Sequence, residues 1–145
     1  MAKVLYTAEA QVTGGRAAGH GRTSDGRLEV DLRVPQELGG DGGGTNPEQL
    51  FAVGFAACFE GALAVVARRQ KLEAEDASID SKVKLLPTGE GGFRLAVDLD
   101  VTLPSIDDPD KAADVVRAAH GVCPYSNATR GNIEVGLTAN GQAVD

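Results

Sequence analysis

Apolar and polar side chains alternate along several stretches of this chain, which is the pattern of half-buried β-strands. One strand is expected over Val4–Val12, ending at Gly14 and Gly15. A hairpin is expected over Arg22–Val34, with Ser24-Asp25-Gly26 as its turn. Further strands are predicted over residues 77–86 and 93–103, as a second hairpin around TGEGG, and over residues 132–137.

The stretch from Thr45 to Lys71 has no such alternation and is the longest unbroken run in the chain. Thr45 is predicted as the N-cap, with Pro47 in the first turn and Glu48 at the spacing of a capping box. These signals predict one long central helix.

Residues 50–67 of this helix are apolar on nearly every face, interrupted by Cys58 and Glu60. A helix of this kind is buried inside a protein or in a membrane. Glu60 near the centre, the Ala and Gly content and the strands elsewhere argue against a membrane span. We therefore expect a buried helix and no membrane partner.

The order of elements predicts an α+β fold, with helices packed against antiparallel sheet, in a single domain over residues 1–145. Asp107-Asp108-Pro109 is expected to open a second helix that ends at Gly121, and Cys123-Pro124 a short third helical turn. A small sheet does not cover a helix that is apolar on every side. A second copy of the chain, forming a homodimer, is expected to complete the burial.

The net charge of −7 and the pI near 4.8 argue against nucleic acid as a partner, because the basic residues are scattered. The start, Met1-Ala2-Lys3, leads directly into the strand pattern and not into the apolar segment of a signal peptide. A cytoplasmic location is therefore expected, in which cysteines are more often reactive, metal-bound or buried than bridged structurally.

The two cysteines of the chain have different surroundings in the sequence. Cys58 lies inside the central helix, and its residue type alone fits a small buried hydrophobe. Cys123 lies at a helix start, where backbone N–H groups stabilise a thiolate. A buried thiol and a second thiol at a helix start suit a peroxidatic cysteine and the cysteine that resolves its sulfenic acid to a disulfide.

A peroxidatic thiolate needs a nearby cation to lower its pKa. Arg16 is attractive because glycines bracket its loop, but composition does not choose it among the arginines. Glu48 precedes Cys58 by ten residues, about 80° away around the helix, and is either a capping residue or the partner that holds an arginine over the thiol. The candidate arginines are Arg16, Arg22, Arg27, Arg33, Arg68, Arg69, Arg94, Arg117 and Arg130.

Four residues of the types that bind zinc are present, His20, His120 and the two cysteines, so a zinc site is possible by residue type alone. None of them shows the short spacing of zinc ligands, and His120 is explained as a residue of a helix C-terminus. No metal site is expected.

Two segments, NPEQLFAVGFAACFEGAL and VCPYSNATRGNIEV, resemble the organic hydroperoxide resistance (Ohr) branch of the OsmC/Ohr family. The resemblance extends over nearly the whole chain, including GGRAAGHGRTSDGRLEVDL and DDPDKAADVVRAAHGVCPYSNATRGN. The segment CPYSNATRGN favours the Ohr branch over its OsmC sister group.

The resemblance implies a thiol peroxidase that reduces alkyl and fatty-acid hydroperoxides to alcohols, in preference to hydrogen peroxide. It implies that Cys58 is the peroxidatic thiolate, that Cys123 resolves it to a disulfide, and that a salt-bridged pair of Arg16 and Glu48 activates Cys58. It also implies an intertwined homodimer with sites at the subunit interface, lipoylated proteins whose dihydrolipoyl groups reduce the disulfide, and no bound cofactor.

The residues add a reason for this substrate preference. Phe51, Phe55 and Phe59 are candidates to line an apolar pocket beside Cys58. Alkyl groups gain about 0.8 kcal/mol per buried CH₂, whereas hydrogen peroxide has no such group. Two alternatives stay open: an OsmC-type general peroxidase, and a thiol redox sensor or lipid-binding module that does not turn over.

Overall fold

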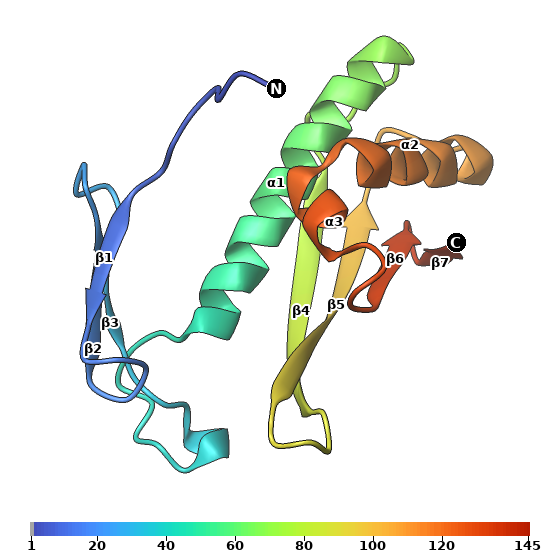
Figure 1. Ribbon diagram of the computed structural model, residues 1–145. Helices are drawn as coiled ribbons and strands as arrows, with labels where there is room; N and C mark the ends of the chain where they lie inside the picture. The colour runs from blue at the N-terminus through green and yellow to red at the C-terminus, as the bar shows by residue number, and fades with distance from the viewer. Residues whose placement is uncertain (1) are drawn as a thin grey trace. The chain divides into compact units, whose positions relative to one another are not determined.

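The computed structural model describes residues 2–145, and the chain divides into two compact units, Met1–Leu50 and Phe51–Asp145. Figure 1 shows the order of the elements along the chain. The expectation of a single domain over residues 1–145 stays a prediction.

The first unit contains a three-stranded antiparallel sheet in the order β1-β2-β3. Its strands are β1 (Ala10–Thr13), β2 (Gly19–Thr23) and β3 (Glu29–Leu32). Gly26 closes the β2–β3 hairpin with a φ of 72°, a conformation that favours glycine. The predicted hairpin and its turn are therefore confirmed.

The first predicted strand was too long. β1 begins at Ala10 and not at Val4, because Ala10 pairs with Thr23, the last residue of β2, and the chain turns away beyond it. Residues 2–9 therefore form no strand pairing within the part of the chain that the structure describes. Val4, Leu5 and Tyr6 are 74%, 93% and 80% exposed.

A short 3-10 helix, η1 (Gln36–Leu38), precedes the long helix α1 (Pro47–Arg69). Thr45 does not cap α1 as predicted, because its backbone forms a bridge to β3, with hydrogen bonds to Asp31 and Arg33. Asn46 caps the helix instead: its Oδ1 accepts a hydrogen bond from the Gln49 N–H at 2.8 Å.

The second unit holds a four-stranded sheet in the order β4-β5-β6-β7. Its strands are β4 (Ser78–Pro87), β5 (Phe93–Thr102), β6 (Val135–Ala139) and β7 (Gln142–Val144). The hairpin of β4 and β5 confirms the prediction, whereas the last predicted strand is shifted to β6 and β7 was missed. β5 and β6 pair in parallel, which corrects the expectation of a purely antiparallel sheet.

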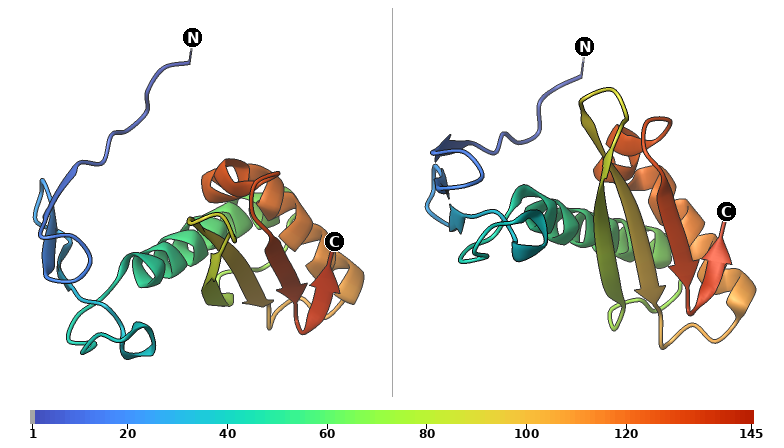
Figure 2. Two further views of the ribbon diagram at one scale, coloured as in Figure 1. Left: turned by 60° about the horizontal axis from the view of Figure 1, so that its bottom comes forward. Right: turned by 90° about the horizontal axis from the view of Figure 1, so that it is seen from below.

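The parallel pairing follows from the connection between β5 and β6. Strands that run in the same direction need a crossover, and here α2 (Pro109–Val122) and α3 (Pro124–Thr129) form it. α2 begins as predicted, with Asp108 as N-cap accepting from the Asp110 N–H at 2.9 Å. Figure 2 shows α1 and α2 on the same face of this sheet.

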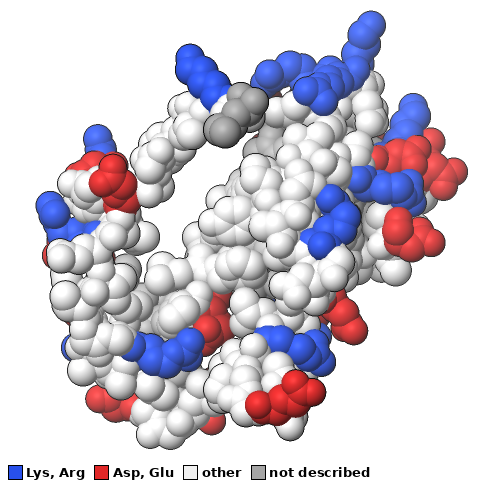
Figure 3. Space-filling model, viewed as in Figure 1, with Lys and Arg blue, Asp and Glu red and all other residues white. Residues whose placement is uncertain are grey.

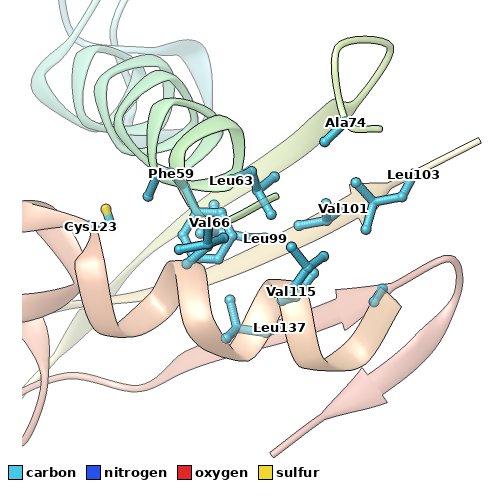
Figure 4. Close-up of a cluster of buried hydrophobic side chains, with 14 of the residues drawn as sticks. Phe59, Leu63, Val66, Ala74, Leu99, Val101, Leu103, Val115, Cys123 and Leu137 are labelled. Carbon is cyan, nitrogen blue, oxygen red and sulfur yellow. The ribbon is translucent and has the colours of Figure 1, made fainter. Parts of the chain in front are cut away.

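The core of the second unit lies between this sheet and the two helices, as Figure 4 shows for Phe59, Leu63 and Val115. α1 buries one face in it, with residues at helical spacing: Phe55, Phe59, Ala62, Leu63, Val66 and Ala67.

The opposite side of α1 is open in this chain, with Val53 72% exposed and Val65 38% exposed. Figure 3 shows few charged side chains over the visible part of α1. A single copy of the chain therefore buries one face of α1, and the expected covering of its other side by a second copy stays a prediction.

By length and composition, α1 is able to cross a membrane, the one such helix among residues 2–145. About a third of its most apolar window is buried in the chain (33%), and its six buried residues belong to the core of the second unit. We therefore identify α1 as the core helix of this fold.

Candidate active site

The structure brings the two cysteines together. Cys58 on α1 and Cys123 between α2 and α3 are both free thiols, and their sulfur atoms lie 3.3 Å apart in a hydrogen bond from Cys123 to Cys58. Cys123 is completely buried, whereas Cys58 is partly exposed. Cys58 is therefore the more accessible of the two cysteines, and the buried Cys123 is in contact with its sulfur.

Cys123 is held by the junction of two helices. Its backbone N–H ends α2 by donating to the Ala119 carbonyl at 2.9 Å, and Pro124 begins α3 immediately afterwards. Its sulfur is the N-cap of α3 and accepts a hydrogen bond from the Ser126 N–H at 3.5 Å. The predicted position of Cys123 at a helix start is confirmed, and Figure 4 shows its sulfur on the side of α2 that faces α1.

The pKa of the Cys58 thiol is raised from its ordinary value. Burial is the main cause, and the hydrogen bond with Cys123 adds to it. The backbone N–H of Tyr125, in the first turn of α3, acts in the opposite direction and lowers the pKa. Within the second unit, the backbone N–H of Tyr125 therefore favours the Cys58 thiolate, and no cationic side chain lowers the pKa of this thiol.

Arg16 and Glu48 form a bidentate ion pair in the first unit. The two guanidinium nitrogens Nη1 and Nη2 each donate to one carboxylate oxygen at 3.1 Å. The Glu48 side chain is only 17% exposed, against 44% for Arg16. Glu48 therefore binds Arg16 and is not the capping-box residue that its spacing predicted.

Glu48 and Cys58 lie on the same helix, ten residues apart, which is a rise of about 15 Å along the axis of α1. The first unit holds the Arg16–Glu48 ion pair, and the second unit holds the two thiols.

The three phenylalanines proposed as pocket residues lie in different places. Phe59 and Phe55 are completely buried, and Phe59 belongs to the core between α1 and the sheet, as Figure 4 shows. Phe51 is only partly buried and keeps some accessible surface. Tyr125 lies beside Phe51 and Phe55 and was missed by sequence reasoning, although its position two residues after Cys123 was a signal.

The histidines do not join the thiols. His20 lies on β2 and contacts two carboxylates of β3, with Nδ1 3.0 Å from Asp31 and Nε2 2.8 Å from Glu29. These hydrogen bonds raise the pKa of His20, whereas burial and the nearby Arg130 lower the pKa of His120. Among residues 2–145, no group of three or more His, Cys, Asp or Glu side chains is arranged to hold a metal ion.

Comparison with known proteins defines the class. The OsmC-like protein family matches residues 40–138, which is more than half of the chain. A solved structure of a Vibrio cholerae protein with captopril bound in one of its active sites aligns with a TM-score of 0.92 and 44% identity, covering 98% of this chain and 96% of that one. The α+β fold is therefore the OsmC-like fold.

Individual relatives define the branch. An organic hydroperoxide resistance protein of Xanthomonas axonopodis pv. citri is 53% identical over 140 residues, 94% of this chain and 95% of its own. The structure of OhrB of Bacillus subtilis aligns with a TM-score of 0.83 at 47% identity, covering 92% of this chain and 98% of that one. An organic hydroperoxide resistance protein of Legionella pneumophila aligns with a TM-score of 0.88 at 52% identity, covering 93% and 97%. The chain belongs to the organic hydroperoxide resistance (Ohr) branch of the OsmC/Ohr family.

Proposed function

We propose that this protein is a cysteine peroxidase that reduces organic hydroperoxides to alcohols, with Cys58 as the reacting thiol. The observation that carries the proposal is the distance of 3.3 Å between the sulfur atoms of Cys58 and Cys123. The two atoms have to approach by only about 1.2 Å to reach a covalent S–S length of about 2.05 Å. An oxidised Cys58 is therefore within reach of its resolving partner.

The chemistry takes place in two steps. The Cys58 thiolate attacks one oxygen of the hydroperoxide, an S–O bond forms, the O–O bond breaks, and the alkoxide leaves as the alcohol after taking a proton. Cys123 then attacks the sulfenic sulfur of Cys58, and hydroxide leaves as water with the proton of the thiol. An external dithiol returns two electrons and two protons to the disulfide. Dihydrolipoyl groups of lipoylated proteins are the reductant that the family resemblance implies, and no bound cofactor is needed.

The thiolate requires a cation that its own unit does not supply. Burial raises the pKa of Cys58, and Glu48, which binds Arg16, precedes Cys58 by ten residues, a rise of about 15 Å along α1. We therefore propose that the Arg16–Glu48 pair of a second copy lies at Cys58, in a homodimer with two sites across the interface. The guanidinium then lowers the pKa of the thiol and polarises the O–O bond.

Two exposed apolar surfaces support the homodimer. The open side of α1 carries Val53 and Val65, and the segment before β1 carries Val4, Leu5 and Tyr6. Large apolar side chains that are exposed at both places favour contact with another protein surface. A second copy that covers them would produce the intertwined dimer implied by the resemblance, in a water-soluble, cytoplasmic protein.

The test is turnover with a dithiol. The purified protein is mixed with cumene hydroperoxide and dihydrolipoamide, and peroxide loss is followed, with hydrogen peroxide in parallel. We expect many turnovers of cumene hydroperoxide, a much slower reaction of hydrogen peroxide, and no activity in Cys58→Ser. Equal rates for both peroxides would favour the general OsmC-type peroxidase. A single disulfide without turnover would favour the redox sensor, and unchanged activity in Cys58→Ser would exclude Cys58 as the reacting thiol.

A further inference from the structure

The side chain of Tyr125 in α3 packs against α1 beside the reactive thiol. Its ring is stacked on Phe51, with centroids 5.8 Å apart and planes at 29°, and lies 5.7 Å from the ring of Phe55. Phe51 and Phe55 themselves meet edge to face at 5.8 Å. The three rings therefore form one aromatic cluster across the α1–α3 contact.

Gly54 provides the space in which the end of the Tyr125 ring lies. A Cβ atom at Gly54 would lie 3.0 Å from the hydroxyl oxygen, 3.4 Å from Cε2 and 3.5 Å from Cζ of Tyr125. Among residues 2–145, the Tyr125 hydroxyl has no hydrogen-bond partner. The ring is therefore positioned by its fit against Gly54 and the two phenylalanines, and not by a polar contact.

This cluster lies on the face of α1 that carries the thiol. Phe51, Phe55 and Cys58 follow one another at spacings of four and three residues, which places them along one side of the helix. Gly54, against which the end of the Tyr125 ring lies, precedes Cys58 by four residues, about one helical turn. A molecule bound at this sulfur therefore has the Tyr125 ring about one turn away along α1.

Tyr125 is the most exposed residue of the cluster. It is 37% exposed, whereas Phe51 is partly buried and Phe55 is completely buried. A buried phenylalanine under a seated tyrosine makes a rigid apolar wall, because both rings have few rotatable bonds. Such a wall contacts an alkyl or aryl group and offers nothing to hydrogen peroxide.

We propose that Tyr125, seated on Gly54, is a specificity-determining residue that selects hydroperoxides by their organic group. The proposal rests on the peroxidase function proposed above. The ring binds the alkyl or aryl substituent, while the backbone N–H of the same residue stabilises the thiolate. Substrate selection and thiol activation are then separable, since a substitution of the side chain removes the first and keeps the second.

The first experiment compares kcat/KM for hydrogen peroxide, tert-butyl hydroperoxide and cumene hydroperoxide in Tyr125→Ala. We expect a loss of about tenfold for cumene hydroperoxide, mainly in KM, and less than about twofold for hydrogen peroxide. Tyr125→Phe should restore the wild-type order of substrates, because it keeps the ring. An equal loss for all three peroxides, or a loss in Tyr125→Phe as large as in Tyr125→Ala, would overturn the proposal.

The second experiment displaces the ring without removing it. Gly54→Ala places a Cβ atom 3.0 Å from the Tyr125 hydroxyl oxygen, so the end of the ring has to shift, and kcat/KM for cumene hydroperoxide should fall several-fold. Gly121→Ala is the matched control, because a Cβ atom there meets no other atom within 4 Å. In a double-mutant cycle, Gly54→Ala should have no further effect when Tyr125 is already Ala.

The outcomes of the cycle separate the two proposals. The contrary results are that Gly54→Ala lowers kcat/KM equally in the wild-type protein and in Tyr125→Ala, or that it has no effect in both proteins. Either result, in an active peroxidase, would show that the Tyr125 ring does not set specificity. If the wild-type protein consumed no hydroperoxide at all, the peroxidase function itself would fail, independently of Tyr125.

Discussion

Complementation between two inactive variants tests whether the reactive site is shared by two copies of the chain. One variant is Arg16→Ala, which keeps Cys58, and the other is Cys58→Ser, which keeps Arg16. We expect each homodimer to be inactive or nearly so. A heterodimer of the two should be active if the Arg16–Glu48 pair of one copy lies at Cys58 of the other, because it contains one complete site.

The expected magnitude follows from the number of complete sites. Glu48 precedes Cys58 by ten residues, a rise of about 15 Å along α1. In the proposed homodimer, the Arg16–Glu48 pair of each copy activates Cys58 of the other copy, so the wild-type dimer has two sites. One of the two sites in a heterodimer is then intact, and its activity should be about half that of the wild-type dimer.

The assay uses co-expression with two different affinity tags and purification over both. Peroxide consumption with cumene hydroperoxide and dihydrolipoamide is compared with that of both homodimers. The control is a heterodimer in which one copy carries Arg16→Ala together with Cys58→Ser and the other is wild type. This control should be inactive if sites form between copies and half-active if they form within one chain. Activity in the control and none in the complementing pair would refute the reasoning.

Three further predictions concern the second thiol, the histidines and the core. Cys123→Ser should stop disulfide formation, so one equivalent of cumene hydroperoxide leaves a sulfenic acid on Cys58 that dimedone labels; a dimedone-resistant product would argue against the resolving role. NMR titration of the two histidines should place the pKa of His20 above 6.5 and that of His120 below it. Because the folded-state pKa of His20 is raised, its contacts with the two carboxylates stabilise the fold fully below pH 6.5 and lose this effect as pH rises through the folded-state pKa. His20→Gln should therefore lower Tm more at pH 5.5 than at pH 8.5. An equal change in Tm at both pH values would contradict the prediction. Leu63→Ala should cost about 2–5 kcal/mol in denaturant unfolding, against less than about 0.5 kcal/mol for an alanine at the exposed Phe93; similar losses would contradict the assigned core.

In a single chain, the surroundings of Cys58 favour the protonated thiol over the thiolate. Burial raises the pKa of Cys58, which keeps the thiol protonated, and the first turn of α3 provides only partial compensation through the Tyr125 N–H. In the proposed homodimer, Arg16 of the second copy would lower the pKa of Cys58 and increase the fraction of thiolate. An isolated protomer should accordingly react slowly with peroxides.

Local signals in the sequence were sufficient for most elements. Gly26 marked the hairpin turn, Asp108-Pro109 the start of α2, and Cys123-Pro124 the start of α3. Each depends on the conformational preferences of a few neighbouring residues, so no distant contact was needed to predict them. The sequence also named Cys58, Cys123, Arg16 and Glu48 as site residues, from the chemistry of a thiol peroxidase and from the resemblance to one family, and their roles stay a prediction.

Contacts between residues far apart in the sequence decided the start of α1 and the start of β1. Thr45 had the composition of an N-cap, but its backbone is bound to β3, and Asn46 caps α1 instead. The strand predicted from Val4 begins only at Ala10, because an alternating pattern does not show whether a neighbouring strand is present to accept its hydrogen bonds.

The sequence by itself determined most of the helices, strands and turns and which side chains are available for chemistry. Only the tertiary structure decided that Cys123 lies 3.3 Å from Cys58, that Arg16 binds Glu48, and that Tyr125 rests on Gly54. The physical reason is separation along the chain: the two cysteines are 65 residues apart, and only the packing of α1 against α2 and α3 brings them into contact.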